Sequence, residues 1–170
     1  MITNIQNDKI DSEYKLSLKS LENHYNIFMY EKSLDANKIY NSIQNNTPIL
    51  KLLDSLSKKQ NINTTKNLKK LLNEIKILNN TDINDLQFIS SNNIILFNYF
   101  SNNNLFYDIQ ESRLDIINVN NIKSKSYGYH SGILKNGFRY LYPLYIKINN
   151  KDKFIGVLDI SYSSNLLQYF

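Results

Sequence analysis

Apolar residues recur every three or four positions through the first half of the chain and every second position through much of the second half. The first spacing is typical of amphipathic helices, and the second is typical of strands with one buried face. An apolar stripe without an intervening Gly or Pro predicts one long helix over residues 12–44. Thr47 and Pro48 suit the cap and first turn of a second helix, so the long helix is expected to end before them.

Two shorter helices follow in this prediction, one after Pro48 and one carrying apolar residues from Leu68 to Leu78. The change to a period of two then predicts a sheet. A polar connection over residues 149–152 is expected to join its last two strands. The expected strands cover residues 86–89, 94–100, 126–133, 137–148 and 153–163, with a short helix over 108–118.

The order of these elements, helices first and then strands joined by short loops, defines the fold class. Antiparallel neighbours with short connections indicate an α+β domain and not a doubly wound α/β one. We therefore predict a single domain over residues 1–170. A long N-terminal helix and small helices should pack on a five-stranded antiparallel sheet within residues 84–163.

The last strand contains a Gly in its interior. Strict alternation places Phe154 on the same face as Leu158, and Ile155 on the opposite face with Val157. Gly156 lies between the two pairs, and a Gly inside a strand often marks the close approach of another element. A helix crossing the sheet at this point is the simplest explanation.

Composition limits the classes of partner. The 170 residues carry a net charge of +5, and a basic balance can favour nucleic acid or an anionic membrane surface. The lysines are spread along the helical half, which is the pattern of a solvated face. No run of about 18 apolar residues and no apolar leader is visible. The chain is therefore interpreted as either a cytoplasmic protein or a soluble piece of a larger one.

The sequence also carries no catalytic motif. It has four Gly residues and no Cys, and it contains no nucleophile elbow, phosphate loop or dinucleotide fingerprint. Its two histidines, His24 and His130, are too few to build a histidine metal site, and no pair of carboxylates is placed for acid–base chemistry. We therefore predict no enzyme activity, no cofactor and no metal.

Two segments of the second half carry a resemblance to a known family. They are residues 137–144 (GFRYLYPL) and residues 154–161 (FIGVLDIS). The second is similar to the family's Ile-Gly pair, acidic residue and Ile-Ser, with Asp159 at the acidic position. The chain from about Leu34 onward resembles the PAS-like extracytoplasmic sensor domains called Cache domains. These domains occur on bacterial histidine kinases, diguanylate cyclases and chemoreceptors.

The resemblance implies a ligand pocket between the sheet and the short helix over 108–118. Many relatives carry an Arg where Arg113 stands, and its planar fork suits a ligand carboxylate. Asp108, Asp115 and Asp159 are alternative partners for it. Relatives also carry an Arg and a His on the second strand, where this chain has neutral residues, so a more aromatic pocket is expected. The residues predicted to line or border it are Asn98, Phe100, Tyr107, Arg113, His130, Arg139, Tyr142 and Asp159.

The resulting functional hypothesis is a non-catalytic sensor on the extracytoplasmic side of a bacterial membrane. It would bind a small molecule, such as a carboxylate or an amino acid, and would be membrane-anchored in the full-length protein. Residues 16–28 of the long helix would meet a second copy in a homodimer. The alternatives are a ligand-free PAS-like interaction or dimerisation module and a basic nucleic-acid-binding protein; no nucleic-acid partner is expected in the main hypothesis.

Overall fold

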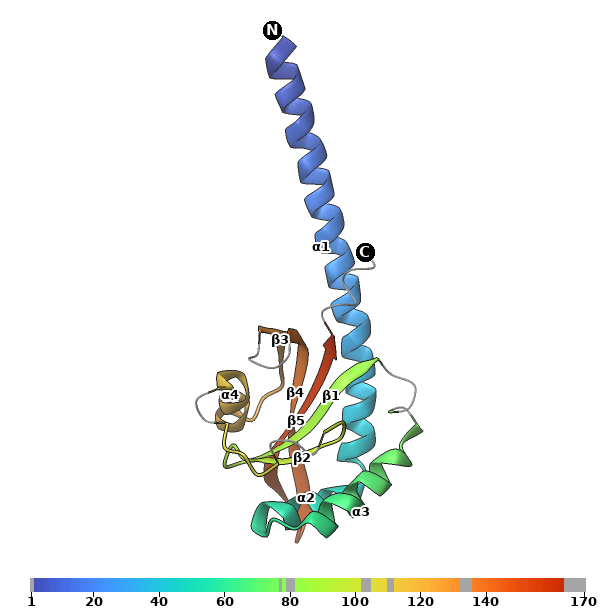
Figure 1. The fold of residues 1–170 in the computed structure, drawn as a ribbon, viewed down its shortest axis with the longest axis vertical. Helices are drawn as coiled ribbons and strands as arrows, with labels where there is room; N and C mark the ends of the chain where they lie inside the picture. The colour runs from blue at the N-terminus through green and yellow to red at the C-terminus, as the bar shows by residue number, and fades with distance from the viewer. Residues whose placement is uncertain are drawn as a thin grey trace.

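The computed structural model describes residues 2–76, 78, 82–101, 105–109, 112–131 and 136–163. A long helical rod runs along one side of an antiparallel sheet, and shorter helices surround the rest of the sheet (Figure 1). The predicted α+β class, with a long N-terminal helix and a five-stranded antiparallel sheet, is therefore confirmed.

The helices lie near the predicted positions, but several of their ends differ. They are α1 (Ile2–Gln44), α2 (Thr47–Lys58), α3 (Ile62–Asn73) and α4 (Leu114–Ile122). The first helix begins well before residue 12, and the third ends before Leu78. The last begins at Leu114 and ends at Ile122, later than the predicted 108 and 118, and Asp108 itself forms an antiparallel bridge with Ile94.

The N-terminus of α2 shows why the long helix stops where it does. The cap is Asn46 and not Thr47, because the Asn46 side chain accepts a hydrogen bond from the backbone N–H of Ile49 at 3.2 Å. Pro48 occupies the first turn, where a missing N–H costs nothing. The chain therefore turns sharply between α1 and α2.

Five strands form one antiparallel sheet in the order β2-β1-β5-β4-β3. They are β1 (Ile83–Ser90), β2 (Ile95–Asn98), β3 (Ser126–Ser131), β4 (Asn136–Ile148) and β5 (Lys151–Ser163). The first and last strands along the chain are thus neighbours at the centre of the sheet. Figure 1 shows that β5 runs toward the pole from which α1 projects.

The connection between β4 and β5 is shorter than predicted. Only Asn149 and Asn150 form the turn, with φ angles of 51° and 61°, while Lys151 pairs with Ile148 in the ladder. A two-residue hairpin turn whose twist matches that of its strands needs both residues in the left-handed conformation. Asn tolerates this conformation. The hairpin therefore continues through residues that the polar pattern assigned to a loop.

A bulge near the start of β5 makes the predicted faces of Phe154 and Ile155 wrong. Leu144 pairs with Gly156 and Tyr145 pairs with Phe154, so Ile155 is an extra residue in the ladder. An extra residue reverses which face the preceding side chains occupy. Ile155 therefore belongs to the same apolar cluster as Leu158, while Phe154 packs against the cluster on the other face.

Gly156 also differs from the expectation of a crossing helix. Its φ is +144°, a conformation that residues with a Cβ rarely adopt, and an added Cβ would lie 2.0 Å from the carbonyl oxygen of Ile89. The close neighbour is thus the backbone of β1, which pairs with β5 at Ser90 and Gly156.

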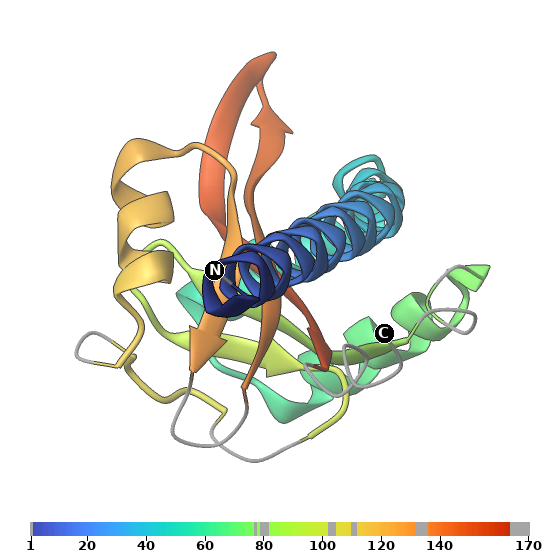
Figure 2. The ribbon, with the colours of Figure 1, turned by 90° about the horizontal axis from the view of Figure 1, so that it is seen from above.

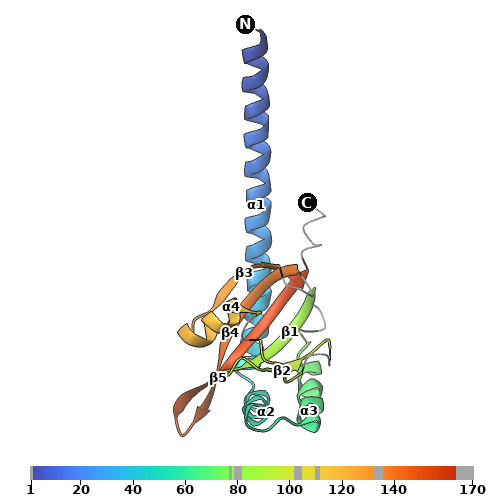
Figure 3. The same cartoon turned by 60° about the vertical axis from the view of Figure 1, so that its left-hand side comes forward.

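The sheet separates two apolar clusters. Side chains of α1, α2 and α3 pack with one face, and those of α4 pack with the other. Figure 2 shows the sheet between α1 and α4. In the part of the chain that the structure describes, no helix has an apolar stretch long enough to cross a membrane. The N-terminal part of α1 projects beyond the sheet as an isolated rod (Figure 3).

We predict that Gly156→Ala lowers the free energy of unfolding by at least about 2 kcal/mol, because it adds a backbone clash to an unfavourable φ. Gly128→Ala is the matched control, since a Cβ at this other strand glycine meets nothing within 4 Å. Its effect should stay within about 0.5 kcal/mol. Urea denaturation of both variants measures the difference, and equal stabilities would contradict the assignment of the bulge.

Candidate functional site

Polar side chains gather on the α4 side of the central strands. Paired residues of neighbouring antiparallel strands face the same side of a sheet. Gln87 of β1 pairs with Asp159 of β5, and Ser161 of β5 pairs with both Asp85 of β1 and Arg139 of β4. Alternation along each strand therefore brings these polar groups to one face. Asp85, Arg139, Asp159 and Ser161 are all buried.

Arg113 joins this face from the residue before α4. Its Nη2 donates to Asp159 Oδ2 at 2.9 Å and to Asp115 Oδ2 at 2.8 Å, and its Nε donates to Asp115 Oδ1 at 2.9 Å. Asp115 thus receives the two parallel hydrogen bonds with which a guanidinium grips a carboxylate. Arg139 Nη1 donates to the same Asp159 oxygen at 2.7 Å.

His130 lies at the edge of this group. Its Nε2 is 3.4 Å from Asp115 Oδ2, and its side chain is 38% exposed, whereas that of Asp115 is 6% exposed. We name the five residues the arginine cluster: Arg113, Asp115, His130, Arg139 and Asp159. It combines three potential cations with two carboxylates, and it reaches solvent on the side of His130.

The charges in this cluster support one another. Burial alone would lower the pKa of Arg113, but the charges of Asp159 and Asp115 raise it above the usual value. Burial alone would raise the pKa of Asp115, but hydrogen bonds and charge from Arg113 hold it below the usual 3.8. Both groups are therefore ionised at neutral pH. Asp115 also lies in the first turn of α4, where a negative charge suits the helix dipole.

Two buried atoms of the cluster lack a partner among the described residues. They are Oδ1 of Asp159, an acceptor, and Nε of Arg139, a donor. Buried polar atoms are usually hydrogen-bonded, and an unmet one has a substantial cost. The cluster therefore holds one acceptor and one donor whose hydrogen-bonding capacity is unmet among the described residues.

The space between α4 and the sheet is filled for much of its length by apolar side chains. Ile116 and Val119 of α4 pack with residues of β1, β4 and β5. The arginine cluster lies beside this core, at the N-terminal end of α4. A ligand on this face would therefore lie near the start of the helix and not along its whole length.

The other residues predicted for the pocket lie elsewhere. Asn98 is on the same face, two strands from Asp159, and its Oδ1 accepts from the backbone N–H groups of Phe100 and Ser101 at 3.0 Å. Phe100 is 47% exposed and Tyr107 is 60% exposed. No contact described here joins these two side chains to the arginine cluster.

Tyr142 lies on the opposite face of the sheet. Its ring stacks on Tyr40 of α1, with centroids 4.6 Å apart, and burial together with Tyr40 raises its pKa to about 12. It borders an open hollow of about 460 Å³ between α1 and strands β3 and β4. This hollow is rich in tyrosine and does not border Arg113.

Asp115 and Gln87 are not among the residues predicted for the pocket. Asp115 is expected only as one alternative partner of Arg113, and in the structure it occupies the guanidinium fork. Gln87 Nε2 donates to Asp85 Oδ2 at 2.9 Å and extends the polar strip onto β1. The signal for this strip was present as polar residues at every second position, in Asp85 and Gln87 and again in Asp159 and Ser161.

The chain is similar to solved sensor domains. No protein-family model and no curated protein matches it. The sensor domain of DcuS from E. coli superimposes with a TM-score of 0.51 and 14% identity, over 81% of this chain and 94% of that one. The sensor domain of the histidine kinase DctB from V. cholerae has a TM-score of 0.54 and 14% identity, over 86% of this chain and 60% of that one.

These likenesses define the class of fold. The chain has the fold of the PAS-like, or Cache, sensor domains, as the resemblance of residues 137–144 and 154–161 predicts. It spans less than two thirds of the DctB sensor chain.

We predict that Asp115→Asn lowers the free energy of unfolding by about 3 kcal/mol at neutral pH, because it removes one partner of a buried ion pair. Because the pKa of Asp115 is depressed in the folded state, its stabilising effect is present above pH 3.8 and is lost as the pH falls through the lower folded value. The gap between variant and wild type should therefore close below pH 3.8.

Urea denaturation at neutral pH and at steps below pH 3.8 measures this gap. Asp35→Asn is the control, because Asp35 pairs with Lys38 at the surface, and its loss should cost less than about 1 kcal/mol. A gap that is constant across the pH range, or a cost equal to that of the control, would show that Asp115 is not held as an ion pair.

Proposed function

We propose that the chain is the extracytoplasmic ligand-sensing domain of a membrane-bound signalling receptor. The observation that carries this proposal is the arginine cluster, in which buried charges from α4, β4 and β5 meet and two buried polar atoms lack a hydrogen-bond partner among the described residues. Buried ion pairs add little net stability compared with apolar residues of the same size. We therefore infer that the cluster binds a ligand in addition to holding α4 on the sheet.

The chemistry of the cluster favours a small carboxylate, and in particular an amino acid. In the structure, Asp115 occupies the fork of Arg113 as a carboxylate of the chain itself. A ligand carboxylate would take this place, while its ammonium would donate to Oδ1 of Asp159, the acceptor without a partner. Both interactions are charge-assisted hydrogen bonds, which are stronger than neutral ones.

Release of Asp115 would affect α4 first, because Asp115 lies in the first turn of that helix. The strands provide a path to the other face. Asp159 lies between Leu158 and Ile160, which pack in the apolar cluster that also contains residues of α1. A ligand can shift the arrangement of α1 only by its difference in affinity for the two states. A coupling of about 1–3 kcal/mol is the usual size.

The arrangement of the two ends suits a domain placed outside a membrane. The rod of α1 projects from one pole, and β5 runs toward that same pole (Figure 1). Membrane segments that precede α1 and follow β5 in a longer protein would therefore lie on one side of the domain. A structural shift in α1 would then reach the membrane directly.

We predict that at least one small amino acid or carboxylate raises the melting temperature of the domain. At a concentration of 100 times its dissociation constant, a ligand adds about 2.7 kcal/mol, which corresponds to roughly 5–10 °C for a domain of this size. Differential scanning fluorimetry with single amino acids and small mono- and dicarboxylates measures the shift.

Arg113→Lys is the informative variant, because it keeps the charge but removes the planar fork. It should weaken the binding of the identified ligand at least about tenfold. His130→Gln, at the exposed rim, is the second variant and should fold normally while weakening binding less than Arg113→Lys does. Absence of any shift across the panel, or a shift unaffected by both substitutions, would overturn the proposed site.

We also propose that the rod of α1 pairs with the rod of a second copy. Its apolar stripe continues at heptad spacing from Phe28 and Tyr25, which contact Phe138 of the sheet, to Leu21, Leu18 and Tyr14 above it. These three upper residues are exposed. Heptad spacing is the pattern that pairs helices into coiled coils. This contact is also what the alternative hypothesis, a ligand-free dimerisation module, would use.

The double substitution Leu18→Glu and Leu21→Glu should shift the domain toward monomer, because it places charges in the apolar seam. Analytical ultracentrifugation over a range of concentrations measures the change. The charge-matched control is Ser17→Glu with Ser20→Glu on the same exposed part of the helix. A wild-type domain that is monomeric at all concentrations, or equal effects of both pairs, would contradict this dimer.

A further inference from the structure

The positive charge of the chain is concentrated at one end of the domain. Helices α2 and α3, Lys59 between them and the tip of the β4–β5 hairpin over residues 145–154 carry nine lysines against two carboxylates, Asp54 and Asp152. This is a formal charge of +7, whereas the whole chain has +5, so the remainder has a charge of −2. We call these elements the lysine pole; its lysines are Lys51, Lys58, Lys59, Lys66, Lys69, Lys70, Lys147, Lys151 and Lys153.

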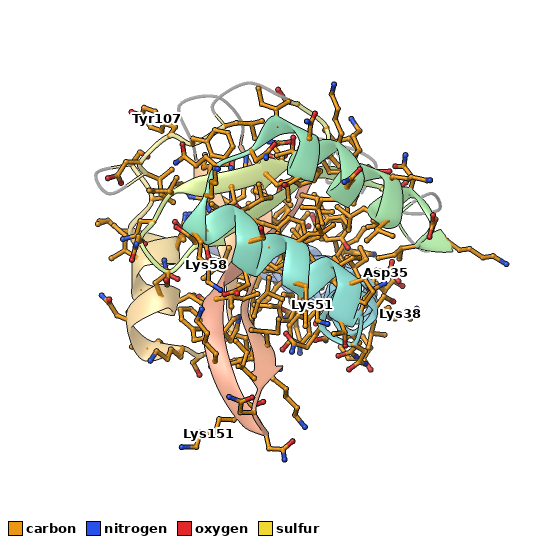
Figure 4. The ribbon with its side chains drawn as sticks, turned by 90° about the horizontal axis from the view of Figure 1, so that it is seen from below. Asp35, Lys38, Lys51, Lys58, Tyr107 and Lys151 are labelled. Carbon is orange, nitrogen blue, oxygen red and sulfur yellow. The ribbon has the colours of Figure 1, made fainter. Side chains whose placement is uncertain are left out.

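These segments come together in space although the hairpin tip is distant in sequence. Helices α2 and α3 and the hairpin tip all lie at the end of the molecule opposite the N-terminus (Figure 3). Seen from this end, Lys51 and Lys58 project from α2, and Lys151 projects from the hairpin tip (Figure 4). A hollow of about 290 Å³, bordered by Lys147, lies between the start of α2 and the hairpin tip.

Little of this charge is neutralised within the chain. Asp54 binds both Lys58 and Lys153, which ties the hairpin tip to α2. The pKa of Asp54 lies below its usual value, because these two lysines outweigh the effect of burial. Six lysines of the pole have no ion pair or ring contact among the described residues: Lys51, Lys59, Lys66, Lys70, Lys147 and Lys151. All six are exposed.

The residue types at the pole indicate which polyanion it fits. The pole contains no Arg, so it offers mobile point charges and not planar forks, and lysines of this kind bind phosphate without fixing its orientation. Residues 47–73, which contain α2 and α3, include no aromatic residue. Proteins that hold single-stranded nucleic acid stack bases on exposed aromatic rings. The helices of the pole lack such a platform, and the two aromatic rings of its hairpin tip, Tyr145 and Phe154, pack edge to face against each other. The pole is therefore suited to a polymer without bases.

We propose that the lysine pole binds a linear phosphate polymer. The proposal is independent of the ligand site, because the arginine cluster lies beside α4 and shares no residue with the pole. Binding would be electrostatic and would release counterions, so its strength would fall steeply with salt. In the orientation proposed above, the polymer would bind at the end of the domain that points away from the membrane.

Inorganic polyphosphate is the probe, and binding to the whole chain is measured by fluorescence anisotropy of the labelled polymer over a range of salt concentrations. The pole variant is Lys66→Glu with Lys70→Glu, two exposed lysines one turn apart on α3. The matched control is Lys15→Glu with Lys19→Glu, two exposed lysines with the same spacing on the rod of α1. Both variants change the net charge equally, and circular dichroism verifies that both fold.

The pole variant should bind polyphosphate at least about tenfold more weakly than wild type at low salt. It should also reduce the slope of log K against log salt by about one unit for each lysine lost. The control should retain wild-type affinity to within about twofold. Equal losses in the two variants would show a response to net charge alone and would overturn the proposal, as would the absence of binding by wild type at low salt. Tighter binding of single-stranded DNA of equal charge would also overturn it.

Discussion

The carboxylate of Asp159 is the constraint around which this domain is arranged. It is 1% exposed, lies on the central strand β5, and receives hydrogen bonds from Arg113 and Arg139 through a single oxygen. A buried carboxylate without such partners would be very costly. The two arginines come from β4 and from the start of α4, so this carboxylate fixes the position of α4 on the sheet.

The two faces of the sheet differ in what packs against them. One face holds α1, α2 and α3 through a continuous apolar cluster, and the other combines a small apolar core under α4 with the arginine cluster. Because successive residues of β5 point to opposite faces, the polar and apolar contacts alternate along one strand. In the proposed function, a change at α4 would reach α1 through the thickness of this single sheet.

Much of the fold can be predicted from the spacing of apolar residues, because each helix and strand buries one face, and the apolar residues recur with the period of that face. That spacing predicts the long helix and all five strands, although the helix begins before residue 12 and several strands begin or end a few residues from their predicted bounds. The bulge at Ile155 was not predictable in this way, since strict alternation contains no extra residues, and it reversed the face of Phe154.

For the site, Arg113, Arg139 and Asp159 do come together, whereas Tyr142 does not join them. Tyr142 and Arg139 are an odd number of residues apart on β4, so strand alternation already puts their side chains on opposite faces of the sheet. The sequence alone could therefore have excluded Tyr142 from the site. Asp115 and Asp159, two of the three alternative partners that the sequence offers for Arg113, both bind it in the structure, whereas Asp108 forms a bridge with Ile94.

The proposed ligand-sensing function depends on an exchange in which a ligand carboxylate replaces Asp115 at the guanidinium of Arg113. The most direct measurement is a crystal structure of the domain with a bound amino acid or small carboxylate. We expect the ligand carboxylate to lie in the fork of Arg113 and a ligand ammonium to face Oδ1 of Asp159. Asp115 should have moved away with the first turn of α4. A ligand bound elsewhere, with the contact between Arg113 and Asp115 intact, would contradict the proposed exchange.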